Sequence, residues 1–378
     1  MKVQKVTAAV IGCGHRGKYV IKNFLEAAKG VFEVGIVYDP DEERIADAEK
    51  EWQIPHVKRA SSMEEAVNDP AVNFVMIFTP NYLHCEAVLA SLDAGKQVFS
   101  EKPLATTIED TERIVEKEKK TNIRVMTGFV LRYSPIYRKV KELLQTGTFG
   151  KIVNISANEN RISWGGGASM SADYGWRRFT EKAGPYLLEK CSHDLDLLNW
   201  FAGALPVKVA AFCGRDYFIP EYSSLWDKYS HEVYAAIVPE KNRINPFTSP
   251  KNIYDNHTVI MEYPNGIKMN FQLTLANAIE ERRMYISCTE GTIIVDSAEG
   301  IIKYKRYDEE CETILSYGKA GGVHAGGDSV MAQEIIQCVL SGGKNSSASG
   351  SVNAMGCALV ALAADESVKT GKIVTLKS

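Results

Sequence analysis

The sequence predicts an α/β protein with two domains: an amino-terminal doubly wound parallel sheet, and a carboxy-terminal α+β domain with a large open, mostly antiparallel sheet. The chain has 378 residues, more than one hydrophobic core usually holds. In its first third, short apolar runs alternate with segments of helical periodicity, as in βαβ units. Beyond about residue 206, glycine-centred turns separate apolar runs, as in antiparallel sheets. We expect domains at 1–130 and 131–378, and leave open whether the carboxy-terminal helices pack back toward the first domain.

The expected elements of the first domain follow from β-branched runs and from apolar residues at helical spacing. The expected strands are residues 6–11, 32–38, 74–78, 97–100 and 123–127. The expected helices are residues 18–28, 42–52, 63–68, 84–94 and 108–121. Right-handed crossovers between parallel strands then give a doubly wound sheet.

The pattern changes after about residue 130. Helices are expected at residues 132–146, 185–200, 329–340 and 352–370, and the glycine run 164–167 is expected to be a loop that could close over a ligand. Two hairpins are expected, one turning at Pro264-Asn265-Gly266 and one at Thr289-Glu290-Gly291. We find no internal repeat.

The composition excludes several functional classes. Hydrophobic residues make up 45% and charged residues 24%, and the formal net charge is -3, so no basic field favours nucleic acid or an anionic membrane. The eight cysteines are scattered singly, without a CxxC pair, so we expect reduced thiols and no metal site. We see no signal peptide and no apolar run of membrane-spanning length. We therefore expect a cytoplasmic protein whose partner is a small molecule.

A glycine motif follows the first expected strand and opens a helix, which predicts a dinucleotide site. The motif is Gly12-Cys13-Gly14-His15-Arg16-Gly17. Its glycines permit a tight turn and let a pyrophosphate approach the helix N-terminus. Asp39 ends the second strand, where a carboxylate binds the adenosine ribose and repels a 2′-phosphate. The motif therefore favours NAD over NADP, although Arg16 and Arg44 could still accommodate a further phosphate.

A second motif resembles a known family. The run Phe78-Thr79-Pro80-Asn81-Tyr82-Leu83-His84 is followed by Ala94-Gly95-Lys96-Gln97-Val98-Phe99-Ser100-Glu101-Lys102-Pro103. Together they resemble the glucose–fructose oxidoreductase and inositol dehydrogenase family (Gfo/Idh/MocA), and the likeness continues through residues 137–152 and 350–372. The resemblance implies a Rossmann domain, NAD, and a sugar or polyol substrate.

The resemblance also implies roles for these residues. Lys102 matches the family's lysine beside the nicotinamide, where a cation stabilises alkoxide character as hydride leaves carbon, and the Lys102–Pro103 bond is a candidate for the cis form. The other implied cofactor contacts of this region are Thr79, Pro80, Asn81, His84 and Glu101.

The acid/base group is expected in the run Glu189-Lys190-Cys191-Ser192-His193-Asp194-Leu195-Asp196. The i, i+4 spacing places Glu189 and His193 on one helical face, and histidine titrates nearest neutrality. The family more commonly has Asp at the Glu189 position, so the carboxylate of this chain extends one methylene further. Asp196 is expected to be structural.

Further residues are expected to face the substrate. Arg132 and Tyr133 follow the last strand of the first domain. The run Tyr174-Gly175-Trp176-Arg177-Arg178 combines an aromatic plane with guanidinium groups, which suits a sugar. From this run we expect Trp176 and Arg177 to contact the substrate. In the glycine-rich loop 323–328 we expect His324 to contact the substrate and Asp328 to be the N-cap of the next helix.

We therefore expect an NAD-dependent oxidoreductase acting on CH–OH groups of a sugar, cyclic polyol or related compound, with Lys102, His193 and Glu189 as its catalytic residues. Two alternatives remain: an NAD-retaining, redox-neutral glycosidase that uses transient oxidation, and a non-catalytic NAD-binding regulator. Retention of both Lys102 and His193 argues against the regulator. The resemblance further implies a homodimer or homotetramer.

Overall fold

The computed structural model describes residues 5–172, 175–229, 234, 238, 240–318, 324, 326–344 and 348–376, without the side chains of Trp164 and Ala168. The chain forms two compact units, Met1–Ser134 with Gly326–Ala358, and Pro135–Ala325 with Leu359–Ser378. The expected second domain, 131–378, thus includes a segment, 326–358, that packs with the first unit.

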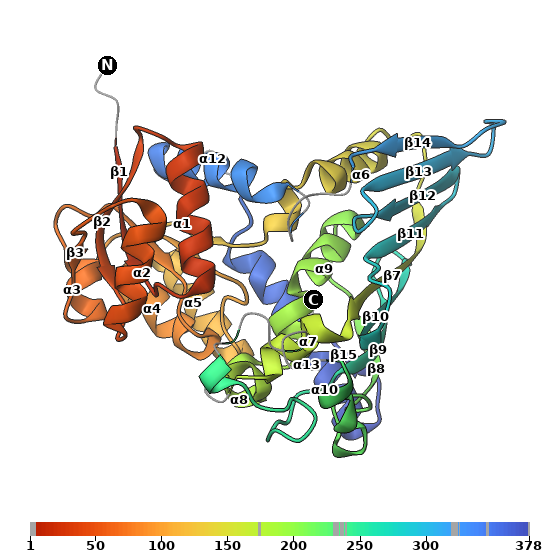
Figure 1. Ribbon diagram of the computed structural model, residues 1–378. Helices are drawn as coiled ribbons and strands as arrows, with labels where there is room; N and C mark the ends of the chain where they lie inside the picture. The colour runs from red at the N-terminus through yellow and green to blue at the C-terminus, as the bar shows by residue number, and fades with distance from the viewer. Residues whose placement is uncertain are drawn as a thin grey trace. The chain divides into compact units, whose positions relative to one another are not determined.

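A parallel sheet forms the centre of the first unit (Figure 1). Its strand order is β3-β2-β1-β4-β5-β6, and every neighbouring pair is parallel. The strands are β1 (Val6–Ile11), β2 (Phe32–Tyr38), β3 (Lys58–Arg59), β4 (Phe74–Ile77), β5 (Gln97–Ser100) and β6 (Val125–Thr127). The helices are α1 (His15–Ala27), α2 (Glu42–Trp52), α3 (Met63–Asn68), α4 (His84–Asp93), α5 (Ile108–Thr121) and α12 (Gly327–Leu340). This order confirms the predicted doubly wound, Rossmann-like sheet.

The core of the first unit explains why α12 belongs to it. Phe24, Phe74 and Phe99 are fully buried in one apolar cluster, and Met331 and Ile335 of α12 are buried in the same cluster. Helix α12 therefore closes the core of a sheet whose strands lie far earlier in the sequence.

A mixed sheet forms the second unit. Its strand order is β14-β13-β12-β11-β7-β10-β9-β8-β15; β7 and β10 are parallel and the other pairs are antiparallel. The strands are β7 (Ile152–Ile162), β8 (Lys208–Gly214), β9 (Asn256–Glu262), β10 (Lys268–Asn277), β11 (Arg283–Cys288), β12 (Gly291–Asp296), β13 (Ile301–Arg306), β14 (Thr313–Ser316) and β15 (Val374–Thr375). Both predicted hairpins are present, as β9–β10 and β11–β12.

The other long helices are α6 (Pro135–Gln145), α9 (Tyr186–Ala202) and α13 (Ser351–Thr370). Helix α13 belongs to the first unit up to Ala358 and to the second unit from Leu359. The shorter helices are α7 (Ser163–Met170), α8 (Thr180–Ala183) and α10 (Ser224–Lys228). Helix α6 begins at Pro135 rather than at the expected residue 132. Proline suits the first position of a helix, and it disfavours helical backbone at the residue before it.

The expected loop at 164–167 is wrong, because these residues lie in α7. Glycine lowers helix propensity, but here it permits close packing. A Cβ atom at Gly166 would lie 2.7 Å from Cδ1 of Leu275, and one at Gly167 would lie 2.8 Å from Cδ1 of Tyr234. Contacts from other parts of the second unit thus stabilise a helix that local preference does not predict.

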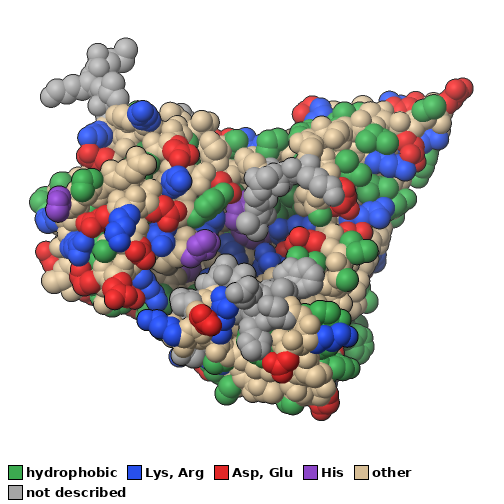
Figure 2. Space-filling model, viewed as in Figure 1, with side chains coloured by type: hydrophobic (Ala, Val, Ile, Leu, Met, Phe, Trp, Pro, Cys, Tyr) green, Lys and Arg blue, Asp and Glu red, His purple; other side chains and the backbone are tan. Residues whose placement is uncertain are grey.

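The distribution of charge over the surface and the state of the cysteines follow from the side chains themselves. Figure 2 shows basic and acidic side chains intermixed over the first unit on the face in view. Among the described residues, no helix is long and apolar enough to cross a membrane. All eight cysteines are free thiols.

Candidate cofactor and substrate sites

The turn between β1 and α1 has the geometry of a phosphate-binding loop. Gly12 has a φ of 98°, and a Cβ atom there would lie 2.8 Å from the carbonyl carbon of Phe78. At Gly17 a Cβ atom would lie 2.4 Å from the Gly12 oxygen, whereas at Gly14 it would meet nothing within 4 Å. Gly14 is the N-cap of α1 and has no side chain that could occupy the helix N-terminus. The first N–H groups of α1 therefore face space that suits a pyrophosphate.

Asp39 fits the adenosine ribose of the same cofactor. Its buried carboxylate accepts hydrogen bonds from the backbone N–H of Cys13 at 2.8 Å and of Asp41 at 3.0 Å, which fixes it beside the glycine turn. Arg44, a candidate for a 2′-phosphate, instead forms an ion pair with Asp41 at 3.2 Å. The glycine turn and Asp39 therefore fit NAD.

Arg16, the other candidate for a 2′-phosphate, is held by two carboxylates of the first unit. Its Nε donates to Oε1 of Glu101 at 2.8 Å, and one terminal nitrogen lies 3.4 Å from Oδ1 of Asp328. The expectation that Asp328 is the N-cap of α12 is wrong: Gly326 is the N-cap, and Asp328 lies in the first turn with its carboxylate toward Arg16 and Tyr19. Arg16 thus links the glycine turn to Glu101, next to Lys102.

His84 holds the two loops that carry the second motif. It is 1% exposed, and its Nδ1 lies 2.7 Å from the Pro103 carbonyl oxygen while its Nε2 lies 2.9 Å from that of Thr79. Burial lowers the pKa of His84, although both carbonyls raise it. Both ring nitrogens are engaged, so His84 acts through Thr79 and Pro103.

Lys102 lies just after the end of β5. Its side chain is half-buried, and the Lys102–Pro103 peptide bond is cis.

Helix α9 presents the second set of candidate residues. Tyr186, Glu189 and His193 recur at intervals of three and four residues, so they share one helix face. All three are buried. The ring of His193 lies 5.6 Å from that of His324, centroid to centroid.

A cation and an aromatic ring lie beside Glu189. The Arg177 Nε donates to its Oε1 at 3.1 Å, and the Arg177 guanidinium carbon lies 4.3 Å from the centre of the Trp176 ring. The structure therefore brings together five predicted residues of the second unit: Trp176, Arg177, Glu189, His193 and His324.

Other predicted residues lie elsewhere. Tyr133 is 1% exposed in the apolar core of the first unit, while its neighbour Arg132 is half-buried. Arg178 is buried and donates to the carbonyl oxygens of Gly175 and Pro250, a structural role. His15 is exposed. Tyr174 lies outside the described residues.

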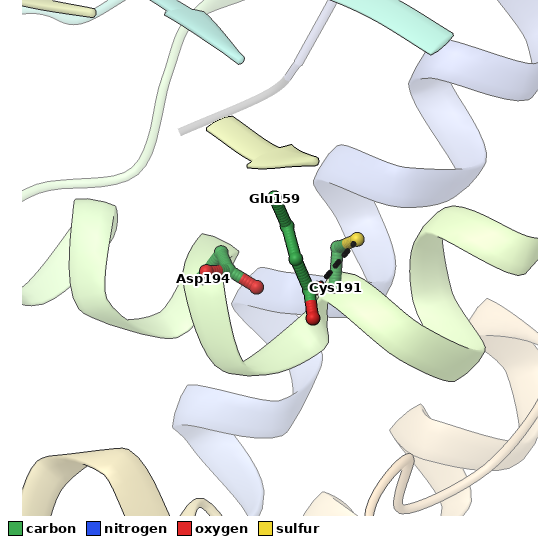
Figure 3. A group of neighbouring side chains, drawn as sticks. All are labelled: Glu159, Cys191 and Asp194. Carbon is green, nitrogen blue, oxygen red and sulfur yellow. Dashed lines mark hydrogen bonds between the residues drawn. The ribbon is translucent and has the colours of Figure 1, made fainter. Parts of the chain in front are cut away.

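A buried ion network lies behind the α9 face, and sequence reasoning missed it. Figure 3 shows Glu159 of β7 beside Cys191 and Asp194 of α9, whose ligand-type atoms all lie within 4.8 Å of one another. Arg282 binds both oxygens of Asp194, at 2.8 and 2.6 Å, and Lys190 lies 3.2 Å from Glu159.

This network has the character of a structural ion cluster rather than a metal centre. Two cations balance its two carboxylates. Burial, together with both carboxylates, raises the pKa of the Cys191 thiol well above its usual value, so the thiol keeps its proton. One signal of the network was present in the sequence: Glu159 and Arg161 alternate at a spacing of two in a strand whose inner face otherwise carries Ile155 and Ala157.

Family models match most of the chain. Residues 6–129 match the model described as "Oxidoreductase family, NAD-binding Rossmann fold", and residues 137–294 match the "GFO/IDH/MocA C-terminal domain". The protein YteT of Bacillus subtilis (strain 168) is 24% identical over 366 residues, which cover 84% of this chain and 85% of that protein. The scyllo-inositol 2-dehydrogenase (NAD(+)) of the same strain is 28% identical over 202 residues, 53% of this chain and 55% of that protein.

Solved structures share the fold over nearly the whole chain. Levoglucosan dehydrogenase in complex with NADH and levoglucosan has a TM-score of 0.82 at 19% identity, covering 99% of this chain and 100% of that one. The WlbA dehydrogenase from Bordetella pertussis, in complex with NADH and UDP-GlcNAcA, has a TM-score of 0.75 at 19% identity, covering the same fractions.

Proposed function

Because this chain belongs to the Gfo/Idh/MocA oxidoreductase family, we propose that it oxidises a hydroxyl-bearing carbon of a sugar or cyclic polyol with NAD. The observation that carries the proposal is the face of α9 on which buried Glu189 and His193 stand together. The relatives are consistent with it: curated ones include inositol dehydrogenases, and a solved structure with the same fold is a levoglucosan dehydrogenase.

Each unit supplies part of the proposed chemistry. The first unit binds NAD, which when bound supplies the hydride acceptor. In the second unit, His193 takes the proton of the reacting hydroxyl as general base. Glu189, oriented by Arg177, accepts a hydrogen bond from a neighbouring substrate hydroxyl. Trp176 offers an aromatic plane to the apolar face of a sugar ring.

Lys102 contributes an ammonium group to the proposed reaction. Its charge stabilises the negative charge that develops on the substrate oxygen as the hydroxyl proton leaves. The contacts of His84 with the Pro103 carbonyl and of Arg16 with Glu101 hold the backbone on both sides of Lys102. Lys102 would thus be presented by a segment fixed at both ends.

The test is formation of NADH at 340 nm with a panel of aldoses, cyclic polyols and glycosides. Lys102→Ala and His193→Ala should each lower kcat by about 10²–10⁴-fold, whereas Lys50→Ala, which removes a lysine whose side chain is 80% exposed, should have no effect. If both Lys102→Ala and His193→Ala keep full activity, the assigned roles are contradicted.

The same panel separates the redox-neutral alternative. One curated relative, from Escherichia coli (strain K12), is a 2,7-anhydro-N-acetylneuraminate hydratase, 28% identical over 213 residues. If glycosides are cleaved without net NADH, while denatured protein releases NAD, the redox-neutral reaction replaces the dehydrogenase. If neither NADH nor cleavage is seen and NAD is bound, the regulator replaces both.

We further propose that the second unit forms a homodimer or homotetramer through the open face of its sheet. Strand register places Phe212, Ile260 and Tyr285 on one face, and they are 81%, 54% and 42% exposed. Exposed apolar residues on a broad sheet typically mark an interaction surface. Light scattering should give two or four chains per particle, and Phe212→Lys with Ile260→Lys should give one; a monomeric wild type would contradict this.

A further inference from the structure

Arg161 is a cation of the second unit that the proposed chemistry does not use. It lies near the end of β7, two residues after Glu159, so both side chains point to the same, helix-covered face of the sheet. Its Nε is buried without a hydrogen-bond acceptor. Among the residues that the structure describes, the Arg161 guanidinium forms no hydrogen bond and no ion pair.

The neighbouring carboxylates are already neutralised. Glu159 is paired with Lys190, Asp194 is bound by Arg282, and Glu189 is bound by Arg177. Glu280, the other carboxylate that acts on Arg161, is exposed, so solvent screens it. Among the described residues, Arg161 is therefore a positive charge on this face without a paired carboxylate.

Gly165 and Tyr186 lie beside Arg161. A Cβ atom at Gly165 of α7 would lie 3.0 Å from one terminal nitrogen of Arg161, so the guanidinium packs against the backbone of α7 where no side chain stands. Burial lowers the pKa of Arg161, and nearby Tyr186 of α9 and Glu159 raise it. Burial raises the pKa of Tyr186, so its phenol keeps the proton and can donate a hydrogen bond.

We propose that Arg161, with Tyr186, binds a carboxylate of the substrate, so that the sugar oxidised is an acidic one such as a uronate. An arginine fork binds both oxygens of a carboxylate, and a half-buried guanidinium without a counter-ion is costly unless a ligand supplies one. One surplus charge matches a monoanionic carboxylate better than a phosphate dianion. This inference rests on the proposed function, because it specifies the substrate of the same α9 face.

The spacing along α9 fits a sugar. Tyr186 and His193 are seven residues apart, which is on the order of 10 Å along the helix axis. A carboxylate held at Arg161 and Tyr186 would thus lie about one sugar ring away from a hydroxyl that reacts at His193. The substrate's acidic group is then remote from the reacting carbon, and its binding energy serves to orient the ring.

The test compares glucuronate and galacturonate with glucose, galactose and glucose 6-phosphate, by NADH formation at 340 nm. The kcat/KM of the better uronate should exceed that of its neutral counterpart by about 10- to 100-fold, the range of a charged hydrogen bond. Arg161→Gln should abolish this ratio, chiefly through KM, and Arg161→Lys should restore part of it. Arg283→Gln, which changes an exposed arginine of β11 that pairs with Glu281, should leave the ratio unchanged.

Three outcomes would overturn the inference while leaving the dehydrogenase intact: neutral sugars preferred, glucose 6-phosphate preferred, or the same ratio in Arg161→Gln. A melting temperature that falls in Arg161→Gln by more than a few degrees would also overturn it, because removing an unpaired buried charge should not destabilise the unit.

If no sugar reduces NAD, the proposed function fails, and binding then decides the inference. With NADH present, a rise in melting temperature with glucuronate or galacturonate but not with glucose, lost in Arg161→Gln, supports the carboxylate site. Equal shifts with acidic and neutral sugars, or none, overturn it.

Discussion

The buried ion network behind α9 gives a sharp stability prediction. Arg282 makes two hydrogen bonds to Asp194, at 2.6 and 2.8 Å, and lies 3.8 Å from Glu159. Arg282→Met would leave the Asp194 carboxylate buried without its cation and Glu159 with Lys190 alone. Breaking a buried pair in this way costs about 3–5 kcal/mol. For a unit of roughly 200 residues, a loss of this size lowers Tm by about 10 °C.

A double-mutant cycle separates the ion pair from packing. Arg282→Met and Asp194→Leu together remove both charges and leave the Glu159–Lys190 pair, so the double variant should recover most of the stability. Thermal melting followed by circular dichroism measures all four proteins. If Arg282→Met costs less than about 1 kcal/mol, or if the two losses simply add, the network does not stabilise the unit as reasoned.

Three further predictions concern the cofactor site and pH. Gly12→Ala places a Cβ atom 2.8 Å from the Phe78 backbone and should abolish NAD binding, measured by calorimetry. Gly30→Ala, also at positive φ but with nothing within 4 Å of its Cβ, should retain NAD binding. Equal losses of NAD binding in the two variants would refute the steric argument. Asp39→Ser should raise kcat/KM for NADP relative to NAD at least about tenfold; an unchanged ratio would remove Asp39 from cofactor selection. Burial lowers the pKa of His257 to about 4, so the folded state resists the proton that the unfolded state accepts near pH 6.5. Stability should therefore fall by about 3 kcal/mol between pH 6.5 and 4, and less so in His257→Leu; identical pH profiles of unfolding would contradict this.

The parts of the cofactor site that are local in sequence could be predicted. Gly12, Gly14 and Gly17 lie within one strand–turn–helix segment, and Asp39 ends the next strand, so periodicity and spacing sufficed. The second carboxylate bound to Arg16 could not be found in this way, because Asp328 is 312 residues away in the sequence. Only the packing of α12 on the first unit's core brings them together.

In the second unit, local patterns were misleading where tertiary contacts decide. A glycine run predicts a loop, but packing against Leu275 and Tyr234 makes residues 163–170 a helix. Glu189 and His193 were predictable, since their spacing fixes a shared helix face. Arg161 was not, because its lack of an ion-pair partner among the described residues is visible only once each neighbouring carboxylate has been matched with its cation.

The most direct test of the central claim is transfer of deuterium from substrate carbon to the nicotinamide. The protein would be incubated with NAD and perdeuterated glucose, glucuronate or myo-inositol, and the mass of the reduced nucleotide measured. The proposed function predicts that at least one of these compounds yields NADH carrying one deuterium, in an amount equal to the sugar oxidised, and that Lys102→Ala and His193→Ala yield far less. Reduced nucleotide without the label, or none at all from a protein that binds NAD, would contradict it.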